Sequence, residues 1–347
     1  MGRREPTGPA SRVTAADVAR RAGVSASAVS RVFTPGASVS KGTSDKVRKA
    51  AEALGYRPNI LARAMITGKS RIIGLVVAHL DNQFYPEALE RLSTALQAHG
   101  YHILVFMTAQ AEAPVDEVLR GIMDYQIDGL VLASVSISSD LAERCRALGL
   151  PVVLFNRSQD DARVSAVTSD NVSGGRRVAE FLIAGGHRRI AYIAGWEGAS
   201  TQRDRELGLT VGLMAHNREI HARAVGGFTT EGAAAATHAL FGADNPPDAV
   251  FVANDIMAFA VIDTLRFALG LSVPDDVSVV GYDDVPAAAW PAYALTTVRQ
   301  SAEAMVAETV TTLIEEIEAT RSAPRRVAID GPLILRGSAR IPEGWPQ

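Results

Sequence analysis

The first 55 residues carry three short helical patterns with recognisable start and stop signals. Thr14, followed three residues later by Asp17, forms a capping box, in which a hydroxyl and a carboxylate satisfy backbone N–H groups at a helix start. Gly23 tolerates the left-handed conformation that ends a helix, and Ser25 can cap the start of the next one. These signals predict a first helix that ends near Ala22 and a second helix that follows at once.

The third pattern lies further along the same segment. Apolar residues recur there with the spacing of one helix face, and Gly55 provides the stop. The residues expected to turn inward in this three-helix head are Val29, Val32, Phe33, Val47, Ala50, Ala51 and Leu54. The rest of the second helix is then free to face a binding partner.

Charge divides the chain into two parts. Residues 1–68 contain 12 Lys and Arg against 4 Asp and Glu, a net charge of +8, whereas the remainder contains 23 against 34, a net charge of −11. A basic head suits the neutralisation of DNA phosphates, whereas the same phosphates repel an acidic body. DNA contact is therefore expected within the first 68 residues.

The head also resembles a known family. Its motifs are Val13–Ala19, Gly23–Ser25, Val29–Val32, Tyr56–Asn59 and Ala62–Arg63. They resemble the lactose repressor (LacI/GalR) family of bacterial transcription regulators, and the resemblance extends over essentially the whole chain. It implies an α/β fold class, with a small all-α helix-turn-helix headpiece and a hinge helix before a two-lobed, periplasmic-binding-protein-like body with parallel sheets.

The resemblance implies which headpiece residues read DNA. The candidates for the major groove are Ser25, Ala26, Ser27, Ser30 and Arg31. An Arg that bonds guanine through two N–H groups is the strongest single reader of a base edge. Because Ala26 and Ser27 are small, direct readout is expected to depend on Arg31 and on contact with a thymine methyl group.

A hinge segment follows the headpiece. Pro58 suits the first turn of a helix and Gly68 its end, so residues 59–67 form a segment too short to be a stable helix alone. In the family, two such helices pair across the dimer axis and insert an apolar wedge into the minor groove. The hinge candidates are Asn59, Ala62, Arg63 and Met65, with Met65 at the wedge position where the family most often has Leu. The alternative is that Met65 only packs against the partner helix.

From Arg71 onward, short β-branched runs alternate with helical stretches such as Pro86–Ala98 and Gly175–Ile183. The predicted strands are Ile72–Ala78, Ile103–Phe106, Gly129–Ala133, Pro151–Phe155, Ile190–Ala194, Ala249–Val252 and Val277–Gly281. Alternation of this kind predicts parallel sheets, and the length of the segment predicts two lobes. The resemblance implies three crossovers between the lobes, the last near Thr297–Ser301.

The expected domains follow from these patterns. They are a disordered basic arm at 1–12, the headpiece at 13–57, the hinge helix at 58–69, and an effector-binding and dimerisation domain at 70–347. Its first lobe is expected at about 70–167 and 300–330, and its second lobe at about 168–299 and 331–347.

Ligands of parallel-sheet proteins bind at the carboxyl ends of the strands, so polar residues there are candidates for an effector site. They are Asp81, Phe84, Tyr85, Asn156, Arg157, Arg205, Phe228, Asn254 and Asp255. Arg forks, Asp acceptors and aromatic faces suit a sugar, sugar acid or polyol. The aromatic residues have lobe packing as their alternative role. Asp170 and Asp283 are assigned to helix caps or turns and are left out of the site.

Catalytic and cofactor motifs are missing from the sequence. No two of the 29 glycines are separated by a single residue, so the dinucleotide fingerprint is absent. Neither a Gly-x-Ser-x-Gly elbow nor a His-Glu-x-x-His pair occurs, and the seven His are scattered. We therefore expect no catalytic residues, no metal and no cofactor. The single Cys145 cannot form an intrachain disulfide, which fits a reducing cytoplasm.

Two other classes of protein share such a body: a sugar-binding transport protein and a sugar-acting enzyme. The first requires export, but the first residues lack an apolar region and no later stretch approaches the length of a membrane span. The second requires an acid and a base, for which Asp81 and Asp255 could be proposed, although both are explained equally well as acceptors for hydroxyl groups. The favoured hypothesis is a cytoplasmic DNA-binding repressor whose operator affinity is controlled by a small effector. The sequence does not decide whether that effector is an inducer or a corepressor.

The expected partners are a near-palindromic DNA operator, the effector and a second copy of the chain, and no membrane. Two recognition helices and two hinge helices require a homodimer. No leucine heptad follows Leu335, so a dimer rather than a tetramer is expected.

Overall fold

The computed structural model describes residues 13–34, 37–57, 69–78, 80–108, 116–135, 137–160, 162–320 and 323–345. The predicted basic arm and the hinge candidates Asn59, Ala62, Arg63 and Met65 lie outside the described residues. The chain divides into two compact units, Met1–Arg71 and Ile72–Gln347, and each is described by itself below.

The first unit contains helices α1 (Ala15–Ala22), α2 (Ala26–Val32) and α3 (Lys41–Leu54). The predicted capping box is present in full at the start of α1, and Gly23 ends that helix with a φ of 67°. Ser25 caps α2 and Gly55 ends α3 in the left-handed conformation. Val18, Val29 and Val47 are buried where the three helices meet. The predicted start and end of α1, the predicted start of α2 and the predicted end of α3 are confirmed.

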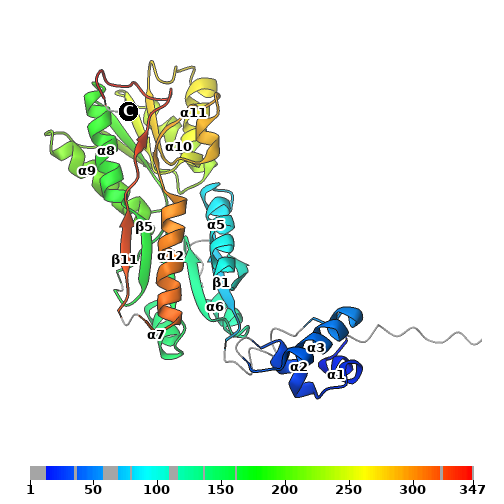
Figure 1. Ribbon diagram of the computed structural model, residues 1–347. Helices are drawn as coiled ribbons and strands as arrows, with labels where there is room; N and C mark the ends of the chain where they lie inside the picture. Colours follow the sequence, from blue (N-terminus) through cyan, green and yellow to red (C-terminus); the bar gives the residue numbers. More distant parts are fainter. Residues whose placement is uncertain are drawn as a thin grey trace, which may run out of the picture. The chain divides into compact units, whose positions relative to one another are not determined.

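In the described residues of the second unit, the strands form two six-stranded sheets. The first sheet, in the order β11-β5-β4-β3-β1-β2, is parallel throughout. Its strands are β1 (Ile72–Val77), β2 (His102–Met107), β3 (Gly129–Ala133), β4 (Val152–Phe155), β5 (Ser165–Ser169) and β11 (Arg326–Ile329). Helices α5 (Phe84–Ala98) and α12 (Ala302–Ile317) pack side by side on one face, and α6 (Asp116–Met123) and α7 (Ser139–Ala147) pack on the other (Figure 1). We call this sheet and its helices the first lobe.

The second sheet has the order β12-β10-β9-β8-β6-β7, with β12 antiparallel to β10. Its strands are β6 (Ile190–Ala194), β7 (Ala222–Val225), β8 (Ala249–Val252), β9 (Ser278–Asp283), β10 (Thr296–Arg299) and β12 (Leu333–Ile334). Helices α8 (Asn171–Ala184) and α9 (Ser200–Met214) lie to one side of it, and α10 (Thr230–Phe241) and α11 (Asp255–Asp263) to the other (Figure 1). A π-helical turn (Thr264–Ala268) and a 3-10 turn (Pro286–Ala289) complete the second lobe.

Among the strands that the structure describes, the chain crosses between the lobes after β5, after β10 and after β11. The prediction that the last crossover lies near Thr297–Ser301 is wrong, because that crossing is the second one. After α12 the chain adds β11 to the edge of the first sheet, and it returns between Ile329 and Leu333 as the antiparallel strand β12.

Two glycines bring helices α8 and α9 into backbone contact. A Cβ atom on Gly208 would lie 2.2 Å from the carbonyl oxygen of Val172, and one on Gly175 would lie 2.3 Å from that of Arg205. Neither backbone can yield cheaply at such a distance, so only glycine allows this helix pair to close. Arg205 lies at this contact, in the second turn of α9, with its carbonyl oxygen facing Gly175.

Within the described part of the chain, no helix is long and apolar enough to cross a membrane. The same residues contain no group of three or more His, Cys, Asp or Glu side chains arranged to hold a metal ion.

Candidate functional site

Helix α2 turns one face into the headpiece and the other to solvent. Val29 and Val32 are buried in the three-helix core. The five predicted major-groove residues, Ser25, Ala26, Ser27, Ser30 and Arg31, are all exposed. Ser25 also has a local task, since its Oγ accepts a hydrogen bond from the N–H of Ala28 at 3.2 Å. The geometry leaves the candidate base-reading side chains accessible on one helix.

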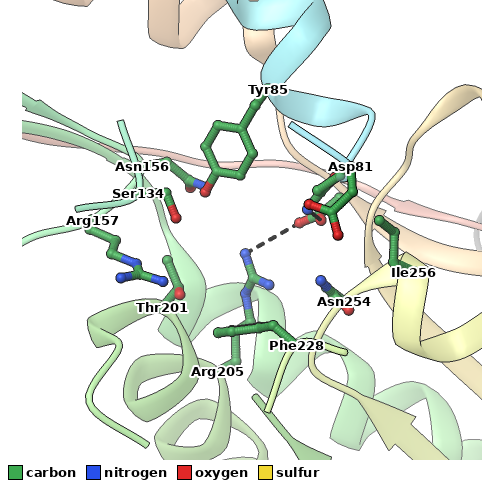
Figure 2. A pocket seen from close by; sticks show the side chains of 12 residues that line it. Asp81, Tyr85, Ser134, Asn156, Arg157, Thr201, Arg205, Phe228, Asn254 and Ile256 are labelled. Carbon is green, nitrogen blue, oxygen red and sulfur yellow. Dashed lines mark hydrogen bonds and ion pairs between the residues drawn. The ribbon is translucent and has the colours of Figure 1, made fainter. Parts of the chain in front are cut away.

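A polar pocket lies between the two lobes of the body. It encloses about 420 Å³ of empty space, part of it open to solvent. The first lobe contributes Asp81, Asn82, Tyr85, Ser134, Asn156 and Arg157, and the second contributes Thr201, Arg205, Phe228, Asn254, Ile256 and Asp283. Figure 2 shows Arg157 and Arg205 pointing toward the same space, with the Tyr85 ring on its far side. Ser134, Asn156 and Arg157 follow directly on strand ends, and Asp283 ends β9, as the parallel topology requires.

Seven of the nine predicted effector residues line this pocket: Asp81, Tyr85, Asn156, Arg157, Arg205, Phe228 and Asn254. Phe84 does not. It is buried in the core of the first lobe, with its ring stacked on Phe155 at 6.0 Å between centroids. Phe84 begins α5, and successive side chains on a helix point in different directions. Tyr85 therefore faces the pocket, while Phe84 packs beneath it.

Asp255 is the second predicted residue that lies outside the pocket lining. Its Oδ1 accepts a hydrogen bond from Thr297 Oγ1 at 2.6 Å, and its Oδ2 accepts one from the N–H of Val285 at 3.0 Å. Burial raises the pKa of this carboxyl well above its usual range, and the nearby charge of Asp283 raises it further. The side chain joins α11 to β10 and to the segment after β9.

Asp283, which the sequence reading left out of the site, belongs to the pocket and is buried there. Its carboxylate accepts hydrogen bonds from Asn82 Nδ2 at 2.9 Å and from Gln300 Nε2 at 2.7 Å, and it pairs with Arg205 Nη2 at 3.4 Å. Burial raises the pKa of Asp283, although Arg205 opposes that rise. The carboxylate thus connects the two lobes across the pocket.

The other residues missed by sequence reasoning are Asn82, Ser134, Thr201 and Ile256. Their position after a strand was the only sequence signal for these four residues. Many residues that do not line the pocket share that position. In contrast, Asp170 caps α8 as predicted, with its Oδ1 accepting a hydrogen bond from the N–H of Ser173 at 3.0 Å.

Arg205 is held on several sides by the second lobe. Its Nε donates to Asn171 Oδ1 at 2.8 Å, and its Nη1 donates to the carbonyl oxygen of Ala253. Its guanidinium lies over the Tyr282 ring, 3.7 Å from the centroid. Together with the Asp283 contact, these partners use three of the five N–H groups of the guanidinium. One N–H on each terminal nitrogen remains for a ligand.

We call the first-lobe residues that line the pocket the first-lobe wall. Two buried polar atoms of this wall have no partner in the described structure: Asn156 Oδ1 and Arg157 Nη1. The amide of Asn156 is otherwise engaged, since its Nδ2 donates to Tyr85 Oη at 2.9 Å. Burial lowers the pKa of Arg157, and Arg205 lowers it further. An unmatched buried donor or acceptor costs about 1–3 kcal/mol, so both atoms favour a ligand that satisfies them.

The backbone at the pocket is unusual as well. Ser134, Asn156, Phe228 and Asp283 all have positive φ values, of 63°, 67°, 62° and 125°. Residues other than glycine occupy this region at a cost, and such residues cluster at binding sites. Each of the four follows or ends a strand, and each lines the pocket.

Comparisons with known proteins agree with this architecture. Residues 14–59 match the family described as "Bacterial regulatory proteins, lacI family". Residues 179–339 match the family described as "Periplasmic binding protein-like domain".

Similar proteins extend over nearly the whole chain. The HTH-type transcriptional regulator CelR of Thermobifida fusca is 34% identical over 332 residues, which are 92% of this chain and 96% of CelR. The probable repressor ExuR of Bacillus subtilis is 29% identical, over 94% of this chain and 98% of its own.

Two solved structures are similar over the same extent. The complex of CelR with cellobiose has a TM-score of 0.71 at 32% identity and covers 94% of this chain and 100% of its own. The Lac repressor dimer bound to its operator has a TM-score of 0.85 at 25% identity, with 94% and 99% covered. The chain therefore belongs to the LacI family of bacterial regulatory proteins, and it is a DNA-binding transcriptional repressor under the control of an effector.

Proposed function

We propose that the pocket between the lobes binds a small polyhydroxylated effector, a neutral sugar or polyol, and that this binding changes the operator affinity of a homodimer. The observation that carries the proposal is the pair of unmatched atoms on the first-lobe wall, Asn156 Oδ1 and Arg157 Nη1. One is an acceptor and the other a donor. A hydroxyl group can donate to the first and accept from the second.

A carboxylate fits this wall less well than a hydroxyl. It would satisfy Arg157, but it would place a second acceptor against Asn156 Oδ1. Neutral sugars are therefore expected to bind more tightly than the corresponding sugar acids. The relative CelR has been solved in complex with cellobiose, a neutral sugar, which supports this preference.

The second-lobe residues that line the pocket, which we call the second-lobe wall, supply complementary groups. Arg205 offers its two remaining N–H groups, and Phe228 offers an aromatic face for a sugar ring. Asn254 uses its Oδ1 to cap α11 by accepting from the N–H of Met257 at 3.0 Å, which leaves its amide NH₂ for the ligand. Binding rather than turnover is the role proposed for these groups, since the relatives over the whole chain are named as regulators.

The DNA-binding part of the proposal concerns the headpiece and the hinge. The exposed residues of α2 read the major groove with Arg31 as the main reader, and Asn59, Ala62, Arg63 and Met65 act in the minor groove. Two copies are needed for a near-palindromic operator, as in the Lac repressor dimer on its operator. The protein acts in the cytoplasm, where its operator lies.

The coupling between the two sites is proposed to run through Asp283. This residue contacts Arg205 in its own lobe and Asn82 in the other, so an effector that engages Arg205 acts on a group that spans the lobes. A coupling of about 1–3 kcal/mol would change operator affinity roughly 5- to 150-fold.

The test is thermal unfolding of the full-length protein with D-glucose, D-galactose, D-ribose, cellobiose and sorbitol, each beside an acid such as D-gluconate or D-glucuronate. A ligand at about 100 times its Kd adds about 2.7 kcal/mol of stability. The Arg157→Met variant is expected to weaken that binding about 10- to 150-fold, because a hydrogen bond from a charged donor is lost. Arg176→Met, which removes an exposed Arg from α8, is the matched control. Binding of acids in preference to neutral sugars would contradict the proposal, as would binding that ignores Arg157.

A further inference from the structure

Arg157 is buried without a polar partner. Only 3% of the residue is exposed, and the described structure gives its guanidinium no hydrogen bond and no ion pair. Its contact is aromatic, since Cζ lies 5.2 Å from the centroid of the Trp196 ring. A ring attracts a cation through its quadrupole, so this contact requires none of the N–H groups to be used as hydrogen-bond donors.

Trp196 belongs to the other lobe. It lies in the loop between β6 and α9, and its ring occupies the space beside Gly198, where a Cβ atom would come within 2.3 Å of the ring. The absence of a side chain at Gly198 therefore leaves room for the Trp196 ring.

Two further contacts join the same two segments. The N–H of Ser158 donates to Ser200 Oγ at 2.9 Å, and Asp160 pairs with Arg203 at 3.6 Å. Segment 157–160 of the first lobe thus docks on segment 196–203 of the second, with the Arg157–Trp196 pair at the end that borders the pocket.

We propose that Trp196 is a positioning residue for the effector: its ring holds the Arg157 guanidinium across the lobe boundary, so that the N–H donors of Arg157 are presented to the pocket when the lobes meet. The inference rests on the proposed function of the pocket. Trp196 is not among the residues that line the pocket, and it acts through Arg157. Because Trp196 and Arg157 belong to different lobes, the contact between them makes sugar affinity depend on lobe closure. Trp196 has this effect without touching the sugar.

The experiment measures the Kd of the full-length protein for D-glucose, D-ribose and cellobiose by calorimetry. Trp196→Leu is expected to weaken binding about 2- to 30-fold, the range of a cation–π contact from exposed to desolvated sites. Trp196→Phe keeps an aromatic face and should restore most of the affinity. Gly198→Ala keeps the Trp but displaces its ring, and should weaken binding as Trp196→Leu does. Trp290→Leu, at an exposed Trp that follows the 3-10 turn Pro286–Ala289, is the control.

A double-mutant cycle separates positioning from general packing. In the Arg157→Met background, Trp196→Leu should cause no further loss of sugar affinity, because the group that it positions is gone. Equal losses in both backgrounds would overturn the inference, and so would a Trp196→Leu protein that binds as the wild type does. A wild-type protein that binds none of the three sugars would instead contradict the proposed function itself.

Discussion

The two walls of the pocket hold their arginines in different ways. Arg205 finds Asn171, Ala253 and Asp283 within its own lobe, whereas Arg157 has as its contact the Trp196 ring of the other lobe. The second-lobe wall is therefore formed before the lobes meet, and the first-lobe wall is completed by their meeting. A preorganised group loses little freedom on binding, so we expect the Arg205 side to capture an effector first and the Arg157 side to report closure.

The largest expected effect compares the two arginines directly in the absence of sugar. Arg205→Met should lower the free energy of unfolding by about 3–5 kcal/mol, because it leaves the buried Asp283 carboxylate without its cation. Arg157→Met should leave stability unchanged or raise it, since it removes a buried charge that has no acceptor. Urea unfolding monitored by circular dichroism measures both variants. Equal losses would show that the two walls are organised alike.

A second variant tests whether the Arg205 wall depends on the α8–α9 contact. Gly208→Ala places a methyl group against the carbonyl oxygen of Val172 and should cost about 1–3 kcal/mol, in spite of the better helix propensity of Ala. It should also weaken sugar binding, because Arg205 lies one turn away. Gly121→Ala, in α6 with open space around it, is the matched control and should be neutral or stabilising. Unaltered stability in Gly208→Ala would show that the helix pair can separate without cost.

The difference between the walls bears on what the sequence could reveal. The headpiece boundaries were predictable because Thr14, Gly23 and Gly55 act on their own neighbours. The predicted strands were apolar runs, and the missed ones, such as β5 and β10, contain Ser and Thr and owe their state to pairing with strands already in the sheet.

The sequence predicted that the pocket lies at strand ends, but it did not predict which side chains face the pocket or which of them contact one another. Nothing local distinguishes Phe84 from Tyr85, because the phase of α5 decides which of them faces the pocket. Asp255 and Asp283 lie in two acidic motifs with similar local signals, yet the bond between Asn82 and Asp283 joins residues 201 positions apart. The unmatched atoms of the first-lobe wall likewise emerge only when distant elements have met.

A third prediction uses pH to probe the second-lobe side. The pKa of Asp255 is raised in the folded state, chiefly by burial, so the folded protein holds this proton more tightly than the unfolded chain. The cost of the buried charge is absent below the ordinary Asp pKa near 4 and grows as pH rises through the folded pKa. Asp255→Asn should therefore stabilise the protein more at pH 8 than at pH 5, measured by thermal unfolding. An Asn can still accept from the N–H of Val285 and can donate to Thr297. A stabilisation that does not change with pH would assign the effect to packing.

The smallest expected effect concerns the docked segments that complete the first-lobe wall. Ser200→Ala removes the acceptor for the N–H of Ser158 and should cost about 0.5–1.5 kcal/mol of the closed state, which corresponds to sugar affinity lower by about 2- to 12-fold. Thr210→Ala, which loses a bond within α9 to the carbonyl oxygen of Glu206, provides the control and should leave the sugar affinity as it is. Small-angle scattering with and without sugar distinguishes the causes. If Ser200→Ala binds sugar weakly but closes as fully as the wild type, the lobes meet without help from this segment, and the first-lobe wall is more independent than its contacts indicate. If affinity and closure fall together, the first-lobe wall is the part of the pocket that senses closure of the lobes.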